Sequence, residues 1–507
     1  MLATILSSAL HGIDALPVEV EVDLGRGMPH FAIVGLGGAV KESRARVRTA
    51  MRNAGYDFPQ NRVIVNLAPA DVKKEGSAYD LPIALGILAA SGTIPAERLR
   101  AYAVLGELSL DGRVKPIRGA LPIAAAARTR GLRGVLLPPG NAAEAAVIQG
   151  VDVVAVETLA EAFDFLRGER ACTPTRVDLP AVVAAHAVAD ADFSDVKGQE
   201  HVKRALEVAA AGGHNVILIG PPGSGKTMLA KRLATILPAL TIDEALETTR
   251  VHSVMGLLDG QPIIAVRPFR APHHTISDAG LVGGGSIPRP GEVSLAHHGV
   301  LFLDELPEFR RNVLEVLRQP LEERRITISR VAGSIAYPAN IMLVAAMNPC
   351  PCGFLGDPKK PCTCSPLQVQ RYRARVSGPL LDRIDIQVEV PAVRYRELAE
   401  RTPSESSARI RDRVEAARRA QLARFAGRAL FCNAQMHARD LRRHCVPDAA
   451  AERLLEQAMA KLGLSARAYT RILKVARTIA DLAAEDAITA AHVAEAIQYR
   501  SLDRALH

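Results

Sequence analysis

The chain has 507 residues and a mass of 54.2 kDa, long enough for about three domains that each bury their own core. With 48% hydrophobic and 23% charged residues, it has the composition of a globular protein, which excludes a disordered chain or a disulfide-stapled miniprotein. The lack of tryptophan and an aromatic fraction of 4% argue against nucleic-acid binding dominated by base stacking.

The net charge of +9 is unevenly distributed. Basic and acidic side chains number 20 and 20 in residues 1–190, 22 and 20 in 191–392, and 21 and 14 in 393–507. The surplus in the last part includes Arg409, Arg411, Arg413, Arg418, Arg419, Arg424 and Arg428. A polyanionic partner would explain this surplus, and so would a solvated helix surface or contacts between subunits.

No membrane segment is expected. The longest uncharged apolar stretch, between Asp80 and Glu97, contains Gly and Pro and is shorter than the ~18 residues needed to cross a bilayer. The first residues lack the basic segment of a signal peptide, so the seven cysteines are expected to be reduced thiols of a cytoplasmic protein.

Residues 1–171 are predicted to form an α/β or α+β domain. Short β-branched runs and segments with helical spacing alternate there, at 31–38, 41–55, 62–69, 81–91 and 103–110. Residues 172–190 show neither pattern and are predicted to be a linker.

Residues 191–392 are predicted to form a second α/β domain around a parallel sheet. The runs at 216–220, 300–305 and 341–348 are continuously apolar, as expected for parallel strands buried on both faces, and helical stretches lie between them. From 393 to 507 the pattern is helical throughout, which predicts a small helical domain.

The strongest motif, G-x-x-x-x-G-K-[ST], lies between a predicted strand and a predicted helix. It consists of Gly220, Pro221, Pro222, Gly223, Ser224, Gly225, Lys226 and Thr227. Its glycines let backbone N–H groups converge on phosphate oxygens, Lys226 supplies a positive charge, and Thr227 supplies a hydroxyl for Mg²⁺. This motif predicts binding of ATP with Mg²⁺.

Polar residues at the ends of the next two predicted strands complete a hydrolytic site. Asp304 is expected to hold Mg²⁺ and Glu305 to act as the general base, although acidic residues can also simply solvate a strand end. Asn348 could orient the attacking water. Arg383, after a short predicted helix, could stabilise the γ-phosphate of a neighbouring subunit, or pair locally with Asp382 or Asp385.

These motifs, with FSDVKGQE at 193–200, LLDR at 380–383 and SARAYTRILKVARTIADL at 465–482, resemble AAA+ ATPases of the magnesium-chelatase-like group. The resemblance implies a P-loop AAA+ core with a C-terminal helical lid, in which Asn348 is sensor 1 and Arg383 the arginine finger. It also implies Arg467 as sensor 2, with Arg471 as a weaker candidate, and assembly into rings, usually hexamers.

Two insertions distinguish the core. Residues 324–340 alternate apolar and polar side chains about a V-A-G turn, which predicts a β-hairpin. It resembles the pore hairpin of ring helicases, so Arg330 near its tip is the candidate DNA contact, with an ordinary exposed charge as the alternative.

The Gly- and His-rich segment 267–299 is expected to be a structured insertion facing the pore rather than a metal site.

Cys350, Cys352, Cys362 and Cys364 form two C-x-C pairs. Four thiolates could hold Zn²⁺ tetrahedrally, but C-x-C is tighter than the usual C-x₂₋₄-C spacing. Four reduced thiols in a turn-rich loop are the alternative.

The N-terminal domain resembles the proteolytic domain of Lon proteases at residues 66–88 and 106–141. The resemblance places Leu121 where the catalytic lysine of Lon stands and Ser77 near the nucleophile. Because a hydroxyl without its base is a poor nucleophile at neutral pH, we expect a Lon-like fold without peptidase activity that serves in assembly or in docking an unidentified partner. A cryptic protease is the alternative.

The order of Lon-like domain, chelatase-type core and helical lid resembles the ComM/YifB family over nearly the whole chain. The resemblance implies a hexameric ATP-driven DNA helicase that promotes branch migration as incoming single strands are integrated during natural transformation. The alternatives are an ATPase motor subunit of a magnesium-chelatase-type complex and a nucleotide switch without turnover. Intact Glu305 and Arg383 argue against the switch.

Overall fold

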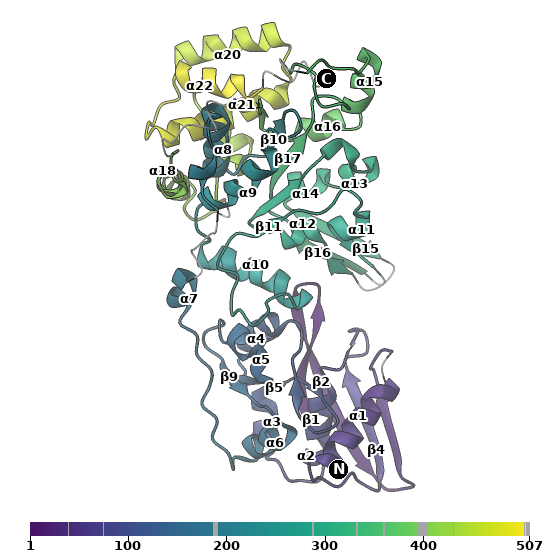
Figure 1. Ribbon diagram of the computed structural model, residues 1–507. Coiled ribbons are helices and arrows are strands. Elements are labelled where there is room, and N and C mark those ends of the chain that lie inside the picture. The colour runs from purple at the N-terminus through teal and green to yellow at the C-terminus, as the bar shows by residue number, and fades with distance from the viewer. Residues whose placement is uncertain are drawn as a thin grey trace. The chain divides into compact units, whose positions relative to one another are not determined.

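The computed structural model divides the chain into two compact units (Figure 1). It describes all residues except 39, 75, 186–190, 286–287, 331–332, 358–359, 393–403, 429, 501 and 503–507, and it omits the side chains of 183–185, 330 and 333. The first unit consists of Met1–Ala187 and Ile242–Ala265, and the second of Val188–Thr241 and Val266–His507. The predicted domain boundaries stay predictions.

The first unit contains a mixed sheet with the strand order β3-β4-β2-β1-β5-β8-β9. The strands are β1 (Leu2–His11), β2 (Asp14–Gly25), β3 (His30–Val34), β4 (Arg62–Ala68), β5 (Tyr102–Val104), β8 (Gly134–Leu137) and β9 (Asp152–Ala155). The predicted run at 62–69 contains β4, and the runs at 31–38 and 103–110 overlap β3 and β5, which each begin one residue earlier. The long antiparallel pair of β1 and β2 was not predicted, although Val18, Val20 and Val22 of β2 are buried in strict alternation.

Helices pack against this sheet, and one of them comes from a distant part of the chain. The helices of the first unit are α1 (Val40–Asn53), α2 (Asp80–Ala89), α3 (Ala96–Ala101), α4 (Ala120–Thr129), α5 (Pro139–Ala145), α6 (Leu159–Arg167), α7 (Leu179–Ala185) and α10 (Ile242–Met255). Helix α10 packs on α4: the Gly119 N–H donates to the Ser253 carbonyl over 3.1 Å, and the Ser253 hydroxyl donates to buried Glu144. Helix α7 lies in the segment predicted as a featureless linker.

The second unit has a five-stranded parallel sheet with the order β11-β14-β17-β10-β18, which confirms the predicted parallel sheet. The strands are β11 (Phe269–Arg270), β14 (Val300–Leu303), β17 (Met342–Met347), β10 (Val216–Ile219) and β18 (Ile386–Glu389). Every residue of β10, β14 and β17 is buried. Because neighbouring parallel strands end at one edge, the residues that follow β10, β14 and β17 come together.

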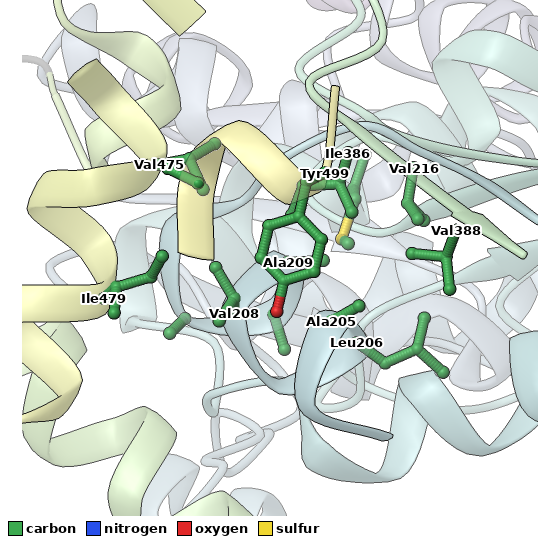
Figure 2. Close-up of a cluster of buried hydrophobic side chains, with 14 of the residues drawn as sticks. Ala205, Leu206, Val208, Ala209, Val216, Ile386, Val388, Val475, Ile479 and Tyr499 are labelled. Carbon is green, nitrogen blue, oxygen red and sulfur yellow. The ribbon is translucent and has the colours of Figure 1, made fainter. Parts of the chain in front are cut away.

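The C-terminal segment is helical, as predicted for the described part of 393–507. Its helices are α18 (Ser407–Arg424), α19 (Ala438–His444), α20 (Ala449–Leu462), α21 (Ala466–Leu482) and α22 (Ala490–Gln498). Helix α8 (Glu200–Gly212) joins them to the sheet through one apolar core (Figure 2). In that core Val208 lies among Val216 of β10, Ile479 of α21 and Tyr499.

The predicted hairpin is present. Strands β15 (Arg325–Arg330) and β16 (Gly333–Pro338) pair antiparallel, with Ile328 opposite Ile335 and Arg330 opposite Gly333. The insertion predicted at 267–299 is structured and contains α11 (Asp278–Val282) and α12 (Glu292–Leu295). Among the described helices, none is long and apolar enough to span a bilayer.

Candidate functional site

The phosphate-binding motif forms the loop between β10 and helix α9 (Lys226–Ile236). Gly223 and Gly225 have φ angles of 77° and 88°, in the left-handed region that favours glycine. A Cβ on Gly220 would lie 2.1 Å from the Val390 carbonyl oxygen, so this position also requires glycine. The loop therefore presents the N-terminus of α9 to its ligand, which favours an anion.

Lys226 lies at the centre of the loop. Its Nζ donates to the carbonyl oxygens of Gly220 and Pro221 over 2.7 and 2.9 Å and to Asn348 Oδ1 over 3.2 Å. Burial lowers its pKa, against the opposing effect of Asp304 and Glu305. These contacts bring the ends of β10 and β17 together, as the motifs predicted.

The loop contains polar groups that could form hydrogen bonds with a polyphosphate. Ser224 Oγ is buried without a hydrogen-bond partner among the described residues. The carbonyls that hold Lys226 are neutral, so a phosphate would be a stronger partner for its ammonium group. The residues present therefore fit a bound nucleotide.

Thr227 and Asp304 are also in contact, which joins α9 to the end of β14. Thr227 Oγ1 donates to Asp304 Oδ2 over 2.6 Å, and Asp304 Oδ1 accepts from the Glu305 N–H over 2.9 Å. A hydroxyl and a carboxylate side by side are oxygen ligands suited to Mg²⁺.

Glu305 has an unusual backbone conformation and a neighbour that the sequence did not reveal. Its φ is 53°, a left-handed conformation that costs a non-glycine residue of order 1 kcal/mol or more. His274 Nδ1 lies 3.5 Å from Glu305 Oε2, and the His274 ring packs edge-on against Phe309. His274 belongs to the Gly- and His-rich segment 267–299, for which the sequence predicts no role at the nucleotide site. Only the fold brings it to Glu305, 31 positions along the chain.

Arg383 is buried and pairs within its own chain. Its guanidinium donates to Glu322 and to the Pro379 carbonyl, while its Nε is buried without a partner in the described part of the chain. The local alternative predicted from sequence, a pair with Asp382 or Asp385, is therefore replaced by a pair with Glu322.

The two candidate sensor 2 arginines contact neighbouring aspartates. Arg467 is 63% exposed, and its Nη1 lies 3.4 Å from Asp382. Arg471 Nη1 lies 2.8 Å from Asp385, which is buried and also contacts His214 Nδ1 at 3.2 Å. Burial alone would raise the pKa of Asp385, but Arg471 and His214 hold it below its usual value. His214 Nε2 in turn lies 2.8 Å from the Thr478 hydroxyl of α21, so this network ties the helical segment to the sheet.

Other predicted site residues lie apart from this centre. The four cysteines come together, with their Sγ atoms all within 4.8 Å of one another. The backbone of Arg330 lies in β15, but its side chain is outside the described part of the structure.

In the described part of the Lon-like region, Ser77 and Lys74 each bind a different partner. The Ser77 hydroxyl donates to the Glu107 carboxylate, and Leu121 is fully buried in α4. Lys74 is buried and donates to the Pro69 carbonyl, and burial lowers its pKa.

Several arginines that contribute to the C-terminal charge surplus have partners inside the second unit. Arg413 pairs with Glu207 and Glu405, Arg424 with Asp481, and Arg428 with Asp440. Arg418 donates to the carbonyls of Ala210 and Ala211. Much of the surplus therefore serves packing.

Three family models match the chain. The model described as "Magnesium chelatase, subunit ChlI" matches residues 192–398, "Subunit ChlI of Mg-chelatase" matches 20–141, and "Magnesium chelatase, subunit ChlI C-terminal" matches 404–500. Together they span both units and the helical segment.

Some similar proteins can be aligned with this chain over its full length. "Uncharacterized protein YifB" of Salmonella typhimurium and "Competence protein ComM" of Haemophilus influenzae are each 45% identical over 509 residues, covering 100% of this chain and 98% of the relative. "Lon protease 2" of Bacillus subtilis is 33% identical over 125 residues, 24% of this chain and 22% of that protein. The family implies ATP and Mg²⁺ as cofactors of an ATPase. The chain belongs to the magnesium-chelatase-like AAA+ family that includes YifB and ComM.

Proposed function

We propose that this protein is an ATP-driven DNA motor that promotes branch migration of recombination intermediates while incoming single strands are integrated. The convergence of Lys226 with Asn348 and of Thr227 with Asp304 supports ATP turnover and is the observation that carries the proposal. The DNA role is supported by the similarity to "Competence protein ComM" of Haemophilus influenzae and by the hairpin of β15 and β16.

Each residue of the site has a defined task in this proposal. Lys226 and the amides of residues 220–227 hold the phosphates, while Thr227 and Asp304 hold Mg²⁺, which neutralises charge on the phosphate oxygens. Glu305 accepts a proton from the attacking water, and Asn348 orients that water.

We further propose that the protein acts in the cytoplasm as a homohexameric ring. A finger arginine acts on the nucleotide of an adjacent subunit, so Arg383 would leave Glu322 when subunits assemble. Arg467, which is 63% exposed and lies 3.4 Å from Asp382, would turn to a bound phosphate as sensor 2. Arg330 would touch DNA phosphates in the pore, where contacts carry no sequence information.

The test is the ATPase rate with and without branched DNA, together with a three-strand branch-migration assay. We expect DNA to stimulate hydrolysis most strongly at low salt, because phosphate contacts weaken as salt rises. Glu305→Gln should assemble and bind DNA in ATP without moving strands. A wild-type protein that hydrolyses ATP but shows no stimulation by any DNA at low salt would disprove the DNA role.

The second candidate is a motor subunit for insertion of Mg²⁺ into a porphyrin, which the description of the matching family models favours. The Lon-like region does not separate the two candidates, because the model described as "Subunit ChlI of Mg-chelatase" matches residues 20–141 and neither candidate assigns this region a task. Stimulation of ATP hydrolysis by a chelatase partner and porphyrin, rather than by DNA, would support this second candidate.

A further inference from the structure

The four cysteines between β17 and helix α15 (Pro366–Arg373) form a compact group of sulfur atoms. The Sγ atoms of Cys350 and Cys352 are 3.4 Å apart, and each lies 3.6 Å from Sγ of Cys362. Cys364 completes the set, with all four Sγ atoms within 4.8 Å of one another. All four are free cysteines, so no disulfide explains why they converge.

These separations match one tetrahedral metal ion. With Zn–S bonds of about 2.3 Å, a tetrahedral ZnS₄ centre has sulfur atoms roughly 3.8 Å apart, so the Sγ atoms of Cys350, Cys352 and Cys362 need to separate by only a few tenths of an ångström. An iron–sulfur cluster fits less well, because its cysteines bind different iron atoms and lie farther apart. The donor set and its size favour Zn²⁺.

The backbone around the group supports thiolates. The Cys352 N–H points to Cys364 Sγ and the Cys364 N–H to Cys362 Sγ, each over 3.4 Å. Such outer hydrogen bonds orient metal ligands and offset their negative charge. A turn closed by the Gly353 N–H and the Cys350 carbonyl, 3.0 Å apart, accommodates the tight C-x-C spacing.

The same loop packs on the phosphate-binding loop. Gly353 has a φ of 85°, and a Cβ there would lie 2.5 Å from Pro222 Cδ. Cys350 is also only two positions beyond Asn348, the partner of Lys226. Between β17 and α15 the described residues form no helix or strand, so a metal would supply order that secondary structure does not.

We propose that Cys350, Cys352, Cys362 and Cys364 bind one structural Zn²⁺ ion, which holds this loop against the phosphate-binding loop. The binding of zinc by the four cysteines does not depend on the proposed function. The claim that this loop braces a nucleotide site does rest on the proposed function.

The metal is tested by elemental analysis of the full-length protein produced with added zinc. We expect about one equivalent of zinc per chain and no iron, as a four-thiolate site predicts. The double variant Cys350→Ser/Cys362→Ser should lose it, whereas Cys172→Ser, which removes a thiol of the first unit, should retain it. Wild-type protein without zinc, with iron instead, or with zinc that persists in the double variant would overturn the proposal.

Cobalt substitution tests the geometry without relying on variants that fold poorly. Wild-type protein refilled with Co²⁺ should show thiolate-to-cobalt charge-transfer bands and the strong visible bands of tetrahedral Co²⁺. Weak bands typical of an octahedral oxygen site would contradict a four-thiolate centre.

The bracing is tested with Gly353→Ala, which crowds Pro222 but leaves every thiol in place. We expect retained zinc and nucleotide affinity reduced about tenfold, since small displacements of a binding loop are costly. Retained zinc with unchanged affinity would refute the bracing alone. Absence of nucleotide binding by the wild-type protein would refute the proposed function instead.

Discussion

The two units each bring a lysine, a hydroxyl and a carboxylate into one short region, with different results. In the second unit Lys226, Thr227 and Asp304 converge from the ends of β10 and β14, and Asn348 joins them from β17. In the first unit Ser77 is held by Glu107 and Lys74 by a carbonyl. Composition alone does not make a catalytic site. A parallel sheet brings separate strand ends to one place, whereas the Lon-like region binds its polar groups to local partners.

The largest expected effect comes from Arg383→Ala. If the arginine acts on the nucleotide of a neighbour, the ATPase rate of the assembled ring should fall about 10³-fold, the usual scale for an arginine finger. Nucleotide binding to the isolated chain should persist. The control is Glu322→Gln, which breaks the pair within the chain and should preserve the rate. Equal losses in both variants would mean that the pair is only structural.

Glu305→Gln should lower the ATPase rate by about 10²-fold or more, because the amide cannot accept the proton of the attacking water. Ring assembly in ATP should remain, as measured by light scattering. Its counterpart in the first unit is Glu107→Gln, which should leave the ATPase rate unchanged.

Two buried aspartates, Asp385 and Asp80, should respond to acid in opposite ways. The pKa of Asp385 is lowered, so its stabilisation of the second unit is present above the ordinary carboxyl pKa of about 4 and is lost as pH falls. Burial raises the pKa of Asp80 although Arg46 and Ser43 bind it, so its contribution is present at low pH and is lost as pH rises through that raised value.

Amide hydrogen exchange measures the stability of each unit separately. Asp385→Asn should destabilise the second unit by about 3 kcal/mol at pH 7, because Arg471 is left without its buried partner. Protection should fall in β10 and α21 and remain in β1 and α2. The acid sensitivity of the second unit should then be smaller than in the wild-type protein. Equal loss of protection in both units would contradict this assignment.

His274→Ala should reduce kcat about tenfold with little change in KM, because the histidine positions Glu305 rather than binding nucleotide. His274→Gln, which keeps a hydrogen-bond donor, should recover part of the loss. A raised KM with unchanged kcat would show that His274 acts on binding.

The smallest expected effect is that of Ser77→Ala. Without a lysine base beside Ser77, peptide hydrolysis should be undetectable in both the wild-type and the variant protein, with equal ATPase rates. Cleavage of an unfolded protein substrate by the wild type, abolished in the variant, would overturn the comparison between the units.

The sequence predicted the phosphate site because adjacent residues in one loop determine its geometry, and Asp304 and Asn348 directly follow apolar strands. His274 and Glu322 were missed as partners because those contacts join distant segments and leave no local pattern. The β1 and β2 hairpin was also missed, although the alternation of Val18, Val20 and Val22 with Glu19 and Glu21 is typical of a strand with one buried face.

Helix α10 determines how the protein could be divided. The chain passes between the units three times, near 187, 241 and 265, so cutting the segment predicted as a linker would leave two further connections intact. A fragment beginning after residue 190 would retain α10 but lose α4, and Ala245 and Val251 are buried within the first unit. A fragment trimmed at that boundary would carry helix α10 without the helix α4 on which it packs. Gene fusions or truncations in this family should therefore keep both units together.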